Sequence, residues 1–213
     1  MIRQLFVLLI LVSALTGCGG SGPSKYQVKG TVRVNGQLAG LVRVQFLHTD
    51  HGRYVLFVTG KEESAALVLL DAKEVEPKPI TISLNVEKGS KALTPVVGTT
   101  PEGKAYAFVF HDHDKDVDVE DALSIVALDP DGDGDCKDAK VVKMLKVGKS
   151  AVEGHFGHHD LAFDADKRFA FFTNPGDGTI SALSLKTLEV VATYEVGGMP
   201  THLVARGGKE TDD

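Results

Sequence analysis

The sequence is poor in cysteine, tryptophan and positive charge, and these absences exclude several classes of protein. Cysteine occurs only at Cys18 and Cys136, so stability has to come from a packed core or from bound ions rather than from disulfides. Basic residues number 23 against 29 acidic ones and form no basic block, which argues against nucleic-acid binding. No tryptophan is present to stack on a quinone cofactor. The G-x-S-x-G, P-loop and C-x-x-C-H motifs are also missing, which favours a non-catalytic protein.

The one long apolar run of the sequence covers residues 5–15, directly after a basic N-terminus. It has about the length of a signal-peptide core and is too short to span a bilayer. The residues Leu-Thr-Gly-Cys that end at Cys18 resemble a bacterial lipobox, which implies removal of residues 1–17 and lipidation of Cys18. Residues 18–25 would then be a flexible tether on a membrane of the cell envelope, the outer membrane in a Gram-negative cell. An ordinary secretory signal is the alternative.

Beyond residue 25 the chain shows short apolar runs bounded by Gly, Pro, Asp and Asn, which is the pattern of β-strands rather than helices. The runs recur three times, each time as four strands in succession. The expected strands are 51–60, 65–72, 79–89 and 92–100, then 102–111, 122–130, 139–149 and 159–165, then 166–175, 179–187, 188–198 and 201–207. Four short antiparallel strands per repeat are typical of a propeller blade, so we predict an all-β, propeller-like array.

The last repeat resembles a known family over residues 169–205, FAFFTNPGDGTISALSLKTLEVVATYEVGGMPTHLVA. The order strand, Thr-Asn, Gly-Asp-Gly, strand, T-x-x-V-V-x-T, Val-Gly and Pro is similar to the YVTN-type β-propeller repeat. The resemblance weakens over the two earlier repeats and extends from about residue 41. It implies a β-propeller in an extracytoplasmic setting. It implies little about function, because such propellers mostly present loops for binding.

The chain is short for a complete propeller, because a blade needs about 40–45 residues and a ring typically about four to eight blades. We expect about three to four blades over residues 26–207 and a disordered tail at 208–213. Residues 26–46 suggest two strands joined at Asn35 and Gly36. These strands either complete a shared blade and close a small ring, or begin a carboxypeptidase-regulatory-like Ig module. In a third alternative, a truncated gene product, the array is an open arc, whose exposed edges would favour a homo-oligomer that completes the propeller.

Histidines and aspartates gather in two loops, 111–121 and 148–160, which blade geometry places side by side on one face. Imidazole nitrogen and carboxylate oxygen suit zinc or copper, and the carboxylates could instead orient the rings. Residues two apart in a strand point the same way, so the first two histidines could chelate one ion. Of two adjacent histidines only one joins a site, unless a glycine bends the loop. The candidate ligands are His111, His113, His158, His159, Asp112 and Asp114, with His155 the weakest and a solvated acidic loop the alternative.

A second acidic loop, DPDGDGDCKDAK at residues 129–140, has the alternate carboxylates and the glycine of a calcium-binding loop. The stretch D-x-D-x-D-G that begins at Asp129 matches the first half of such a loop. Lys140 stands at the twelfth position, where an EF-hand has a bidentate Glu, so a later aspartate would have to complete the site. The candidate calcium ligands are Asp129, Asp131, Asp133, Asp135 and Asp138. A solvated acidic turn is the alternative, and bound calcium would have a structural role.

These features predict a lipid-anchored binding module of the cell envelope, with a divalent-metal site on one face and an unknown protein or small ligand as partner. Two alternatives remain open. The first is a zinc- or copper-handling metallochaperone, because residues 106–120 and 157–163 are loosely similar to exported zinc-handling propellers. The likeness lies in an acidic His-rich loop and in a His-His pair before a strand. The second is a lactonase-like hydrolase whose His and Asp side chains activate a metal-bound water, although three blades would struggle to enclose that site.

Overall fold

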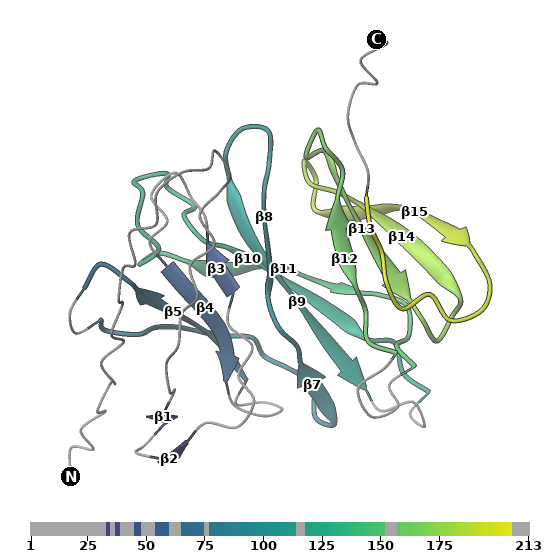
Figure 1. The fold of residues 1–213 in the computed structure, drawn as a ribbon, viewed down its shortest axis with the longest axis horizontal. Helices are drawn as coiled ribbons and strands as arrows, with labels where there is room; N and C mark the ends of the chain where they lie inside the picture. Colours follow the sequence, from purple (N-terminus) through teal and green to yellow (C-terminus); the bar gives the residue numbers. More distant parts are fainter. Residues whose placement is uncertain are drawn as a thin grey trace, which may run out of the picture.

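The computed structural model describes residues 33–34, 37–38, 45–47, 54–59, 65–74, 77–113, 118–151 and 157–205. Every regular element in these segments is a β-strand. No helix long and apolar enough to cross a membrane occurs in this part of the chain. The strands form three larger antiparallel sheets and one separate strand pair (Figure 1).

The three larger sheets follow one another along the chain. The first contains β3 (Gln45–Leu47), β4 (Tyr54–Thr59), β5 (Ala66–Asp71) and β6 (Ile80–Ser83). In the second, β7 (Ser90–Ala92) and β8 (Val96–Thr99) both pair with β9 (Ala105–His113), which is followed by β10 (Ala122–Ala127) and β11 (Lys140–Lys146). The third contains β12 (Leu161–Phe163), β13 (Phe169–Asn174), β14 (Thr179–Ser184) and β15 (Glu189–Glu195). The separate pair, β1 (Arg33–Val34) and β2 (Gln37–Leu38), lies on either side of Asn35 and Gly36, where the sequence predicts two joined strands.

Strand β9 shows why these apolar runs form strands that are buried on both faces. Phe108 and Phe110 belong to the core shared with the third sheet, whereas Ala107 and Val109 belong to the core shared with the first. Successive side chains of a strand point to opposite faces, so a strand between two cores is apolar at nearly every position. The second sheet is therefore the middle layer of the molecule.

Two apolar cores hold the three sheets face to face. The first joins the first and second sheets and includes Leu56, Leu67, Leu69, Ala107, Val109 and Val126. The second joins the second and third sheets and includes Phe108, Leu123, Ile125, Phe172 and Leu183. Each fully buried Leu or Phe side chain contributes about 1.5–3 kcal/mol, so these two layers supply most of the stability of the stack.

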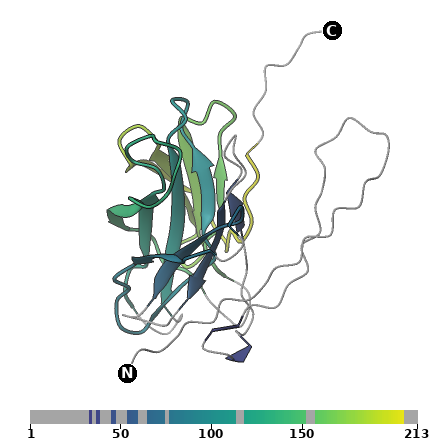
Figure 2. The ribbon, with the colours of Figure 1, turned by 90° about the vertical axis from the view of Figure 1, so that its left-hand side faces the viewer.

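The structure confirms the predicted fold class, an all-β array of antiparallel sheets stacked like propeller blades. Seen from the side of the first sheet, the three sheets lie one behind another (Figure 2). The described sheets form an open array and not a closed ring. The strand predicted at 201–207 is wrong over its described part, because Thr201–Ala205 belongs to no strand. The first strand of a blade forms by pairing with the next strand, and no later strand follows among the described residues.

Candidate functional site

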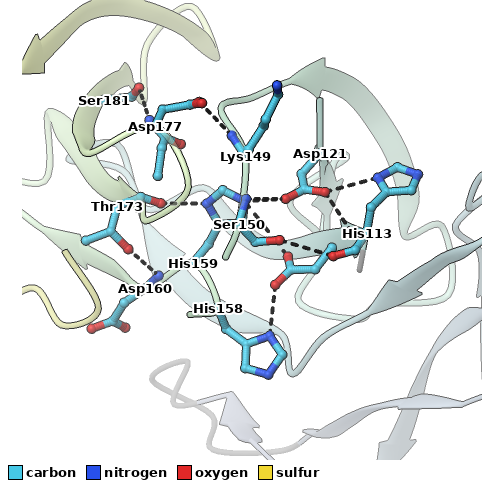
Figure 3. Close-up of polar contacts among 12 residues, drawn as sticks. His113, Asp121, Lys149, Ser150, His158, His159, Asp160, Thr173, Asp177 and Ser181 are labelled. Atoms are coloured by element: carbon cyan, nitrogen blue, oxygen red, sulfur yellow. Dashed lines mark hydrogen bonds and ion pairs between the residues drawn. The ribbon is translucent and has the colours of Figure 1, made fainter. Parts of the chain in front are cut away.

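Two loops that are far apart in the sequence meet at one end of the second and third sheets (Figure 3). Asp112 lies near the end of β9, and Asp121 immediately precedes β10. His158 and His159 precede β12. The ring Nδ1 of His158 donates a hydrogen bond to Asp112 Oδ2 at 2.9 Å. The prediction that these two loops lie side by side is therefore confirmed.

Asp121 is the central residue of this cluster and is only 1% exposed. Its Oδ1 accepts hydrogen bonds from the backbone N–H of His113 at 2.7 Å and from the ring Nδ1 of the same residue at 3.0 Å. Its Oδ2 accepts from the backbone N–H of Ser150 at 2.6 Å and lies 3.1 Å from His159 Nε2. Burial alone would raise the pKa of Asp121, but the hydrogen bonds from His159, Ser150 and His113 outweigh it and hold the pKa well below its usual range. The carboxylate is therefore ionised.

The ring of His159 is fixed from both sides. Its Nδ1 lies 2.5 Å from the carbonyl oxygen of Thr173, to which it must donate, and the ring stacks on Phe110 with centroids 4.7 Å apart. In a neutral ring Nε2 then carries a lone pair, yet it faces the carboxylate of Asp121. Burial lowers the pKa of His159, but the hydrogen bond to Asp121 and the charge of Asp112 raise it overall. Because Nε2 faces a carboxylate oxygen, it is stable there only if it carries a proton or binds a metal cation.

Asp112 brings a second carboxylate to the same place and is 2% exposed. Its Oδ2 accepts from His158, but its Oδ1 is buried without a hydrogen-bond partner. Burial raises the pKa of Asp112 and outweighs the opposing hydrogen bond from His158. A buried carboxylate oxygen without a partner costs free energy. A ligand that binds this atom would therefore add the most stability.

Asp112, Asp121 and His159 together form a buried group that could hold a metal ion. One ligand atom from each lies within 4.8 Å of the others. The Nε2 atom of His159 is 3.1 Å from Asp121 Oδ2 and 3.9 Å from Asp112 Oδ1. In a tetrahedral zinc site with bonds of about 2.0–2.1 Å, neighbouring ligand atoms are about 3.3 Å apart. The spacing and the mixed nitrogen and oxygen donors therefore suit zinc.

The adjacent histidines both reach the cluster because the chain bends in front of them. Residues 157–160 are not a strand, and Gly157 has a φ of +80°, which a residue with a side chain rarely adopts. His158 contacts Asp112 while His159 contacts Asp121. The expectation that adjacent histidines point apart holds for a strand and does not apply to this bend. The bend by a glycine was the exception that the sequence left open.

The other two predicted ligands that the structure describes, His111 and His113, are not members of the metal-capable group. His111 and His113 are two apart in extended β9 and so point to the same side, as the sequence predicts. His113 reaches the cluster through Asp121, whereas His111 is 1% exposed and its Nε2 has no hydrogen-bond partner. Burial lowers the pKa of His111 to about 4, against the effect of the nearby Glu87 carboxylate. Asp114 and His155 lie outside the described residues.

Sequence reasoning did not select Asp121, although this residue organises the site. It is the last acid of the loop and stands directly before the apolar run of β10. An aspartate at such a boundary accepts backbone N–H groups that have no strand partner, and Asp121 does so for His113 and Ser150. That position was the available signal.

The predicted calcium loop lies at the opposite end of β10. The carboxylates of Asp129, Asp131 and Asp138 have oxygens within 4.8 Å of one another, and Asp138 Oδ1 has no hydrogen-bond partner. Asp133 and Asp135 are not part of this group. Each accepts a hydrogen bond from the backbone N–H two residues later, at 2.8 Å. The later aspartate that completes the group is therefore Asp138.

A cleft of about 680 Å³ lies beside this calcium loop rather than beside the histidine cluster. Its wall includes Tyr54, Lys104, Asp129, Asp131 and Lys167. The two acidic groups therefore differ in their access to solvent-filled space.

The chain matches no protein-family model and no curated protein. Several solved structures resemble parts of it, among them the following three. Apo AztD from Citrobacter koseri is 16% identical with a TM-score of 0.45, over 70% of this chain and 34% of that one. Hydrazine synthase from Kuenenia stuttgartiensis is 15% identical with a TM-score of 0.44, over 70% and 48%. The β-propeller domain of Cps50 (Swd1) from Myceliophteria thermophila is 12% identical with a TM-score of 0.44, over 74% and 42%. The matched part thus spans between a third and a half of each of these chains.

Proposed function

We propose that this chain is a binding module of the cell envelope that holds a divalent transition metal, zinc above all, between its second and third sheets. Asp112, Asp121 and His159 are the proposed protein ligands. His158 orients Asp112 through its hydrogen bond, as a group behind a metal ligand commonly does. Three protein ligands leave a fourth zinc position for water or for a group of a partner.

The unpartnered Asp112 Oδ1 is the observation that carries this proposal. It is a buried carboxylate oxygen, 3.9 Å from His159 Nε2 and close to the ionised Asp121. Two buried carboxylates repel each other unless a cation lies between them. A proton on His159 supplies one positive charge, and a zinc ion would supply two and would also satisfy Asp112 Oδ1. Cu(I) prefers sulfur ligands, which this group lacks, so zinc fits better than copper.

Zinc handling, in which the ion passes to a partner, is the finer form of this proposal. The side chain of His158 is 34% exposed while Asp112 beside it is buried, so the site has one edge at the surface. A hydrolase of the lactonase type is less well supported, because the described cleft lies at the other end of β10. The metal-capable group therefore fits binding and exchange better than turnover of an organic substrate.

The calcium loop is proposed as a second, structural cation site. Its support is that Asp129, Asp131 and Asp138 converge, with the backbone N–H groups of Gly132 and Gly134 donating to Asp129 at 2.8 and 3.0 Å. Carboxylate oxygens without nitrogen suit calcium. Weak binding in the millimolar range is expected from so exposed a loop.

Attachment to a membrane through acyl chains on Cys18 belongs to the same proposal. It rests on the apolar run at 5–15 and on the lipobox-like residues that end at Cys18. Intact-mass measurement of the chain from a membrane fraction is expected to show an N-terminus at Cys18 that carries acyl groups. A mature chain with an unmodified Cys18 would overturn the anchor and leave the metal site untouched.

A reciprocal metal titration tests both cation sites in the full chain, stripped of metal and held in detergent. At about one hundred times the dissociation constant, zinc should add about 2.7 kcal/mol of stability, which is roughly 5–10 °C in melting temperature. Asp112→Asn should abolish the zinc shift and leave the calcium shift. Asp131→Asn should do the reverse, and each variant is therefore the matched control of the other.

The titration also has clear adverse outcomes. A zinc shift that survives Asp112→Asn, or disappears equally in Asp131→Asn, would contradict the assignment. Without any zinc shift, the cluster would be only a hydrogen-bonded connection between sheets.

A further inference from the structure

The third sheet has an apolar face on which no other described sheet packs. Phe172 and Leu183 belong to the core shared with the second sheet, so the alternate positions of the same strands face away from it. This open face consists of Phe169, Phe171, Ile180, Ala182, Ala192 and Tyr194, none of which belongs to either core. Figure 1 shows no described strand beyond this side of β12–β15.

Strand pairing shows that the open face is the counterpart of a face that is packed elsewhere. In the second sheet Phe108 lies between Val96 and Ile125, and all three contribute to the core shared with the third sheet. The β9–β10 and β13–β14 hairpins can be aligned at the residue pairs next to their connecting loops. In this alignment Phe171 occupies the position of Phe108. Phe171 correspondingly lies between Ala162 and Ala182.

The exposure of the two faces differs although their chemistry is alike. Phe108, Leu123 and Ile125 are fully buried. On the open face Phe171 and Ile180 are half-buried, and Tyr194 is 55% exposed. An exposed apolar sheet face of this kind usually marks an interaction surface. Its likeness to the packed face of the second sheet indicates that the partner is another β-sheet.

The outer face of the first sheet does not offer that partner. Val55, Phe57 and Val68 alternate with the core residues of β4 and β5, and they are 8%, 8% and 6% exposed within the single chain. A head-to-tail stack would need one open apolar face at each end of the array. The described residues provide one such face, so a head-to-tail stack lacks its second surface.

We propose that two copies of this chain associate through the open faces of their third sheets, related by a two-fold axis. A two-fold interface needs only one kind of surface, because the same patch meets itself. Two stacked sheets then bury Phe169, Phe171 and Ile180 of each copy in a third core, as the existing cores do between the sheets of one chain. This inference is independent of the metal site.

Pairing along the edge strand β15 is the other way in which two copies could meet, and its charges oppose the register that pairs the whole strand. An antiparallel two-fold pairing centred on Ala192 places Glu189 opposite Glu195 of the second copy. Like charges directly opposite each other destabilise a strand pair, and charged residues are a common protection of sheet edges. The proposed contact is therefore face to face and not edge to edge.

Sedimentation equilibrium measures the molecular mass of the full chain in detergent at about 1 to 100 µM. Ordinary protein complexes associate in this range, so a dimer would be detected. The expected mass is twice that of the protomer and stays constant at the upper concentrations. Tyr194→Lys and Ile180→Lys place charge on the open face and should each weaken the dimer at least tenfold. Val142→Lys is the matched control, because Val142 is 41% exposed on the outer strand of the second sheet and should leave the dimer intact.

Circular dichroism checks that each variant keeps its β-structure, and Tyr194 is exposed enough for its replacement to leave folding unchanged. A wild-type protomer mass throughout would overturn the proposal. A mass that keeps rising with concentration would replace the two-fold contact by an open-ended one. A dimer that persists in both Tyr194→Lys and Ile180→Lys would place the contact elsewhere.

Discussion

Two acidic groups lie at the two ends of β10, and the negative charges of their carboxylates are stabilised in different ways. At the start of the strand, Asp112 and Asp121 are buried together with His159. Beyond its end, Asp129, Asp131 and Asp138 are half-buried or exposed. The first group neutralises its charge with histidine, and the second disperses its charge into solvent and backbone N–H groups.

Burial decides what each group can bind. Removing a carboxylate from water costs several kcal/mol, about the scale of a whole small-domain stability, so a buried one persists only with strong partners. Asp121 has such partners in two N–H groups and two histidine rings. The exposed loop needs none of these, and water competes for any ion that it holds. The comparison predicts tight binding of a borderline cation at the buried group and weak binding of a hard cation at the exposed one.

Alanine substitution at the centre of each group should separate them most clearly. Asp121→Ala leaves the buried groups of His113, Ser150 and His159 without their acceptor and should cost about 3–5 kcal/mol of unfolding free energy. Asp129→Ala removes two hydrogen bonds near the surface and should cost about 1 kcal/mol. At about 2–4 °C per kcal/mol, the melting temperature should fall by roughly 10 °C in the first variant and about 3 °C in the second.

Urea denaturation of the metal-free chain measures both losses on one scale. Asp121→Asn keeps the shape of the side chain and removes its charge, so its loss of stability should lie between those of the two alanine variants. Equal losses in Asp121→Ala and Asp129→Ala would show that burial does not distinguish the groups, and the comparison would then fail.

The sequence predicted the strands because their signal is local. Apolar runs bounded by turn residues gave β4, β5, β9, β10, β13 and β14 close to their observed bounds, because each run is rich enough in apolar residues to indicate a strand by itself. The repeat then placed the two histidine-bearing loops on one face. Among the described residues, only Thr201–Ala205 failed as a strand, because a strand depends on a partner that the local residues do not supply.

The hydrogen bonds of the site join residues that only the tertiary structure brings together, so the sequence could not predict them. Asp121 draws its partners from β9, from the segment after β11 and from the bend before β12. No spacing rule connects these positions. The roles of His111 and His113 also separate only in three dimensions. Both point to one side of β9, yet only His113, at the strand end, meets Asp121.

His111 is a buried titratable residue that belongs to neither of the two metal-capable groups, and the effect expected from it is smaller. Its folded pKa of about 4 lies below the ordinary value of 6.5, so the unfolded chain binds its proton first as the pH falls. The neutral ring therefore contributes stability that is fully present above pH 6.5 and is lost as the pH falls towards 4. The loss is at most about 3 kcal/mol, from 1.36 kcal/mol per pKa unit.

His111→Leu should remove this acid-sensitive contribution, so the difference in unfolding free energy between variant and wild type should grow as the pH falls from 6.5 to 4. Because the difference is taken between two chains, the raised pKa of Asp112, which acts in the opposite direction in this range, cancels. The raised pKa of His159 is likewise common to both chains, so its contribution also cancels in the difference. Zinc binding should be unchanged in His111→Leu. A lost zinc shift in this variant would make His111 a ligand and move the metal site from the Asp112 side of β9 to its opposite side.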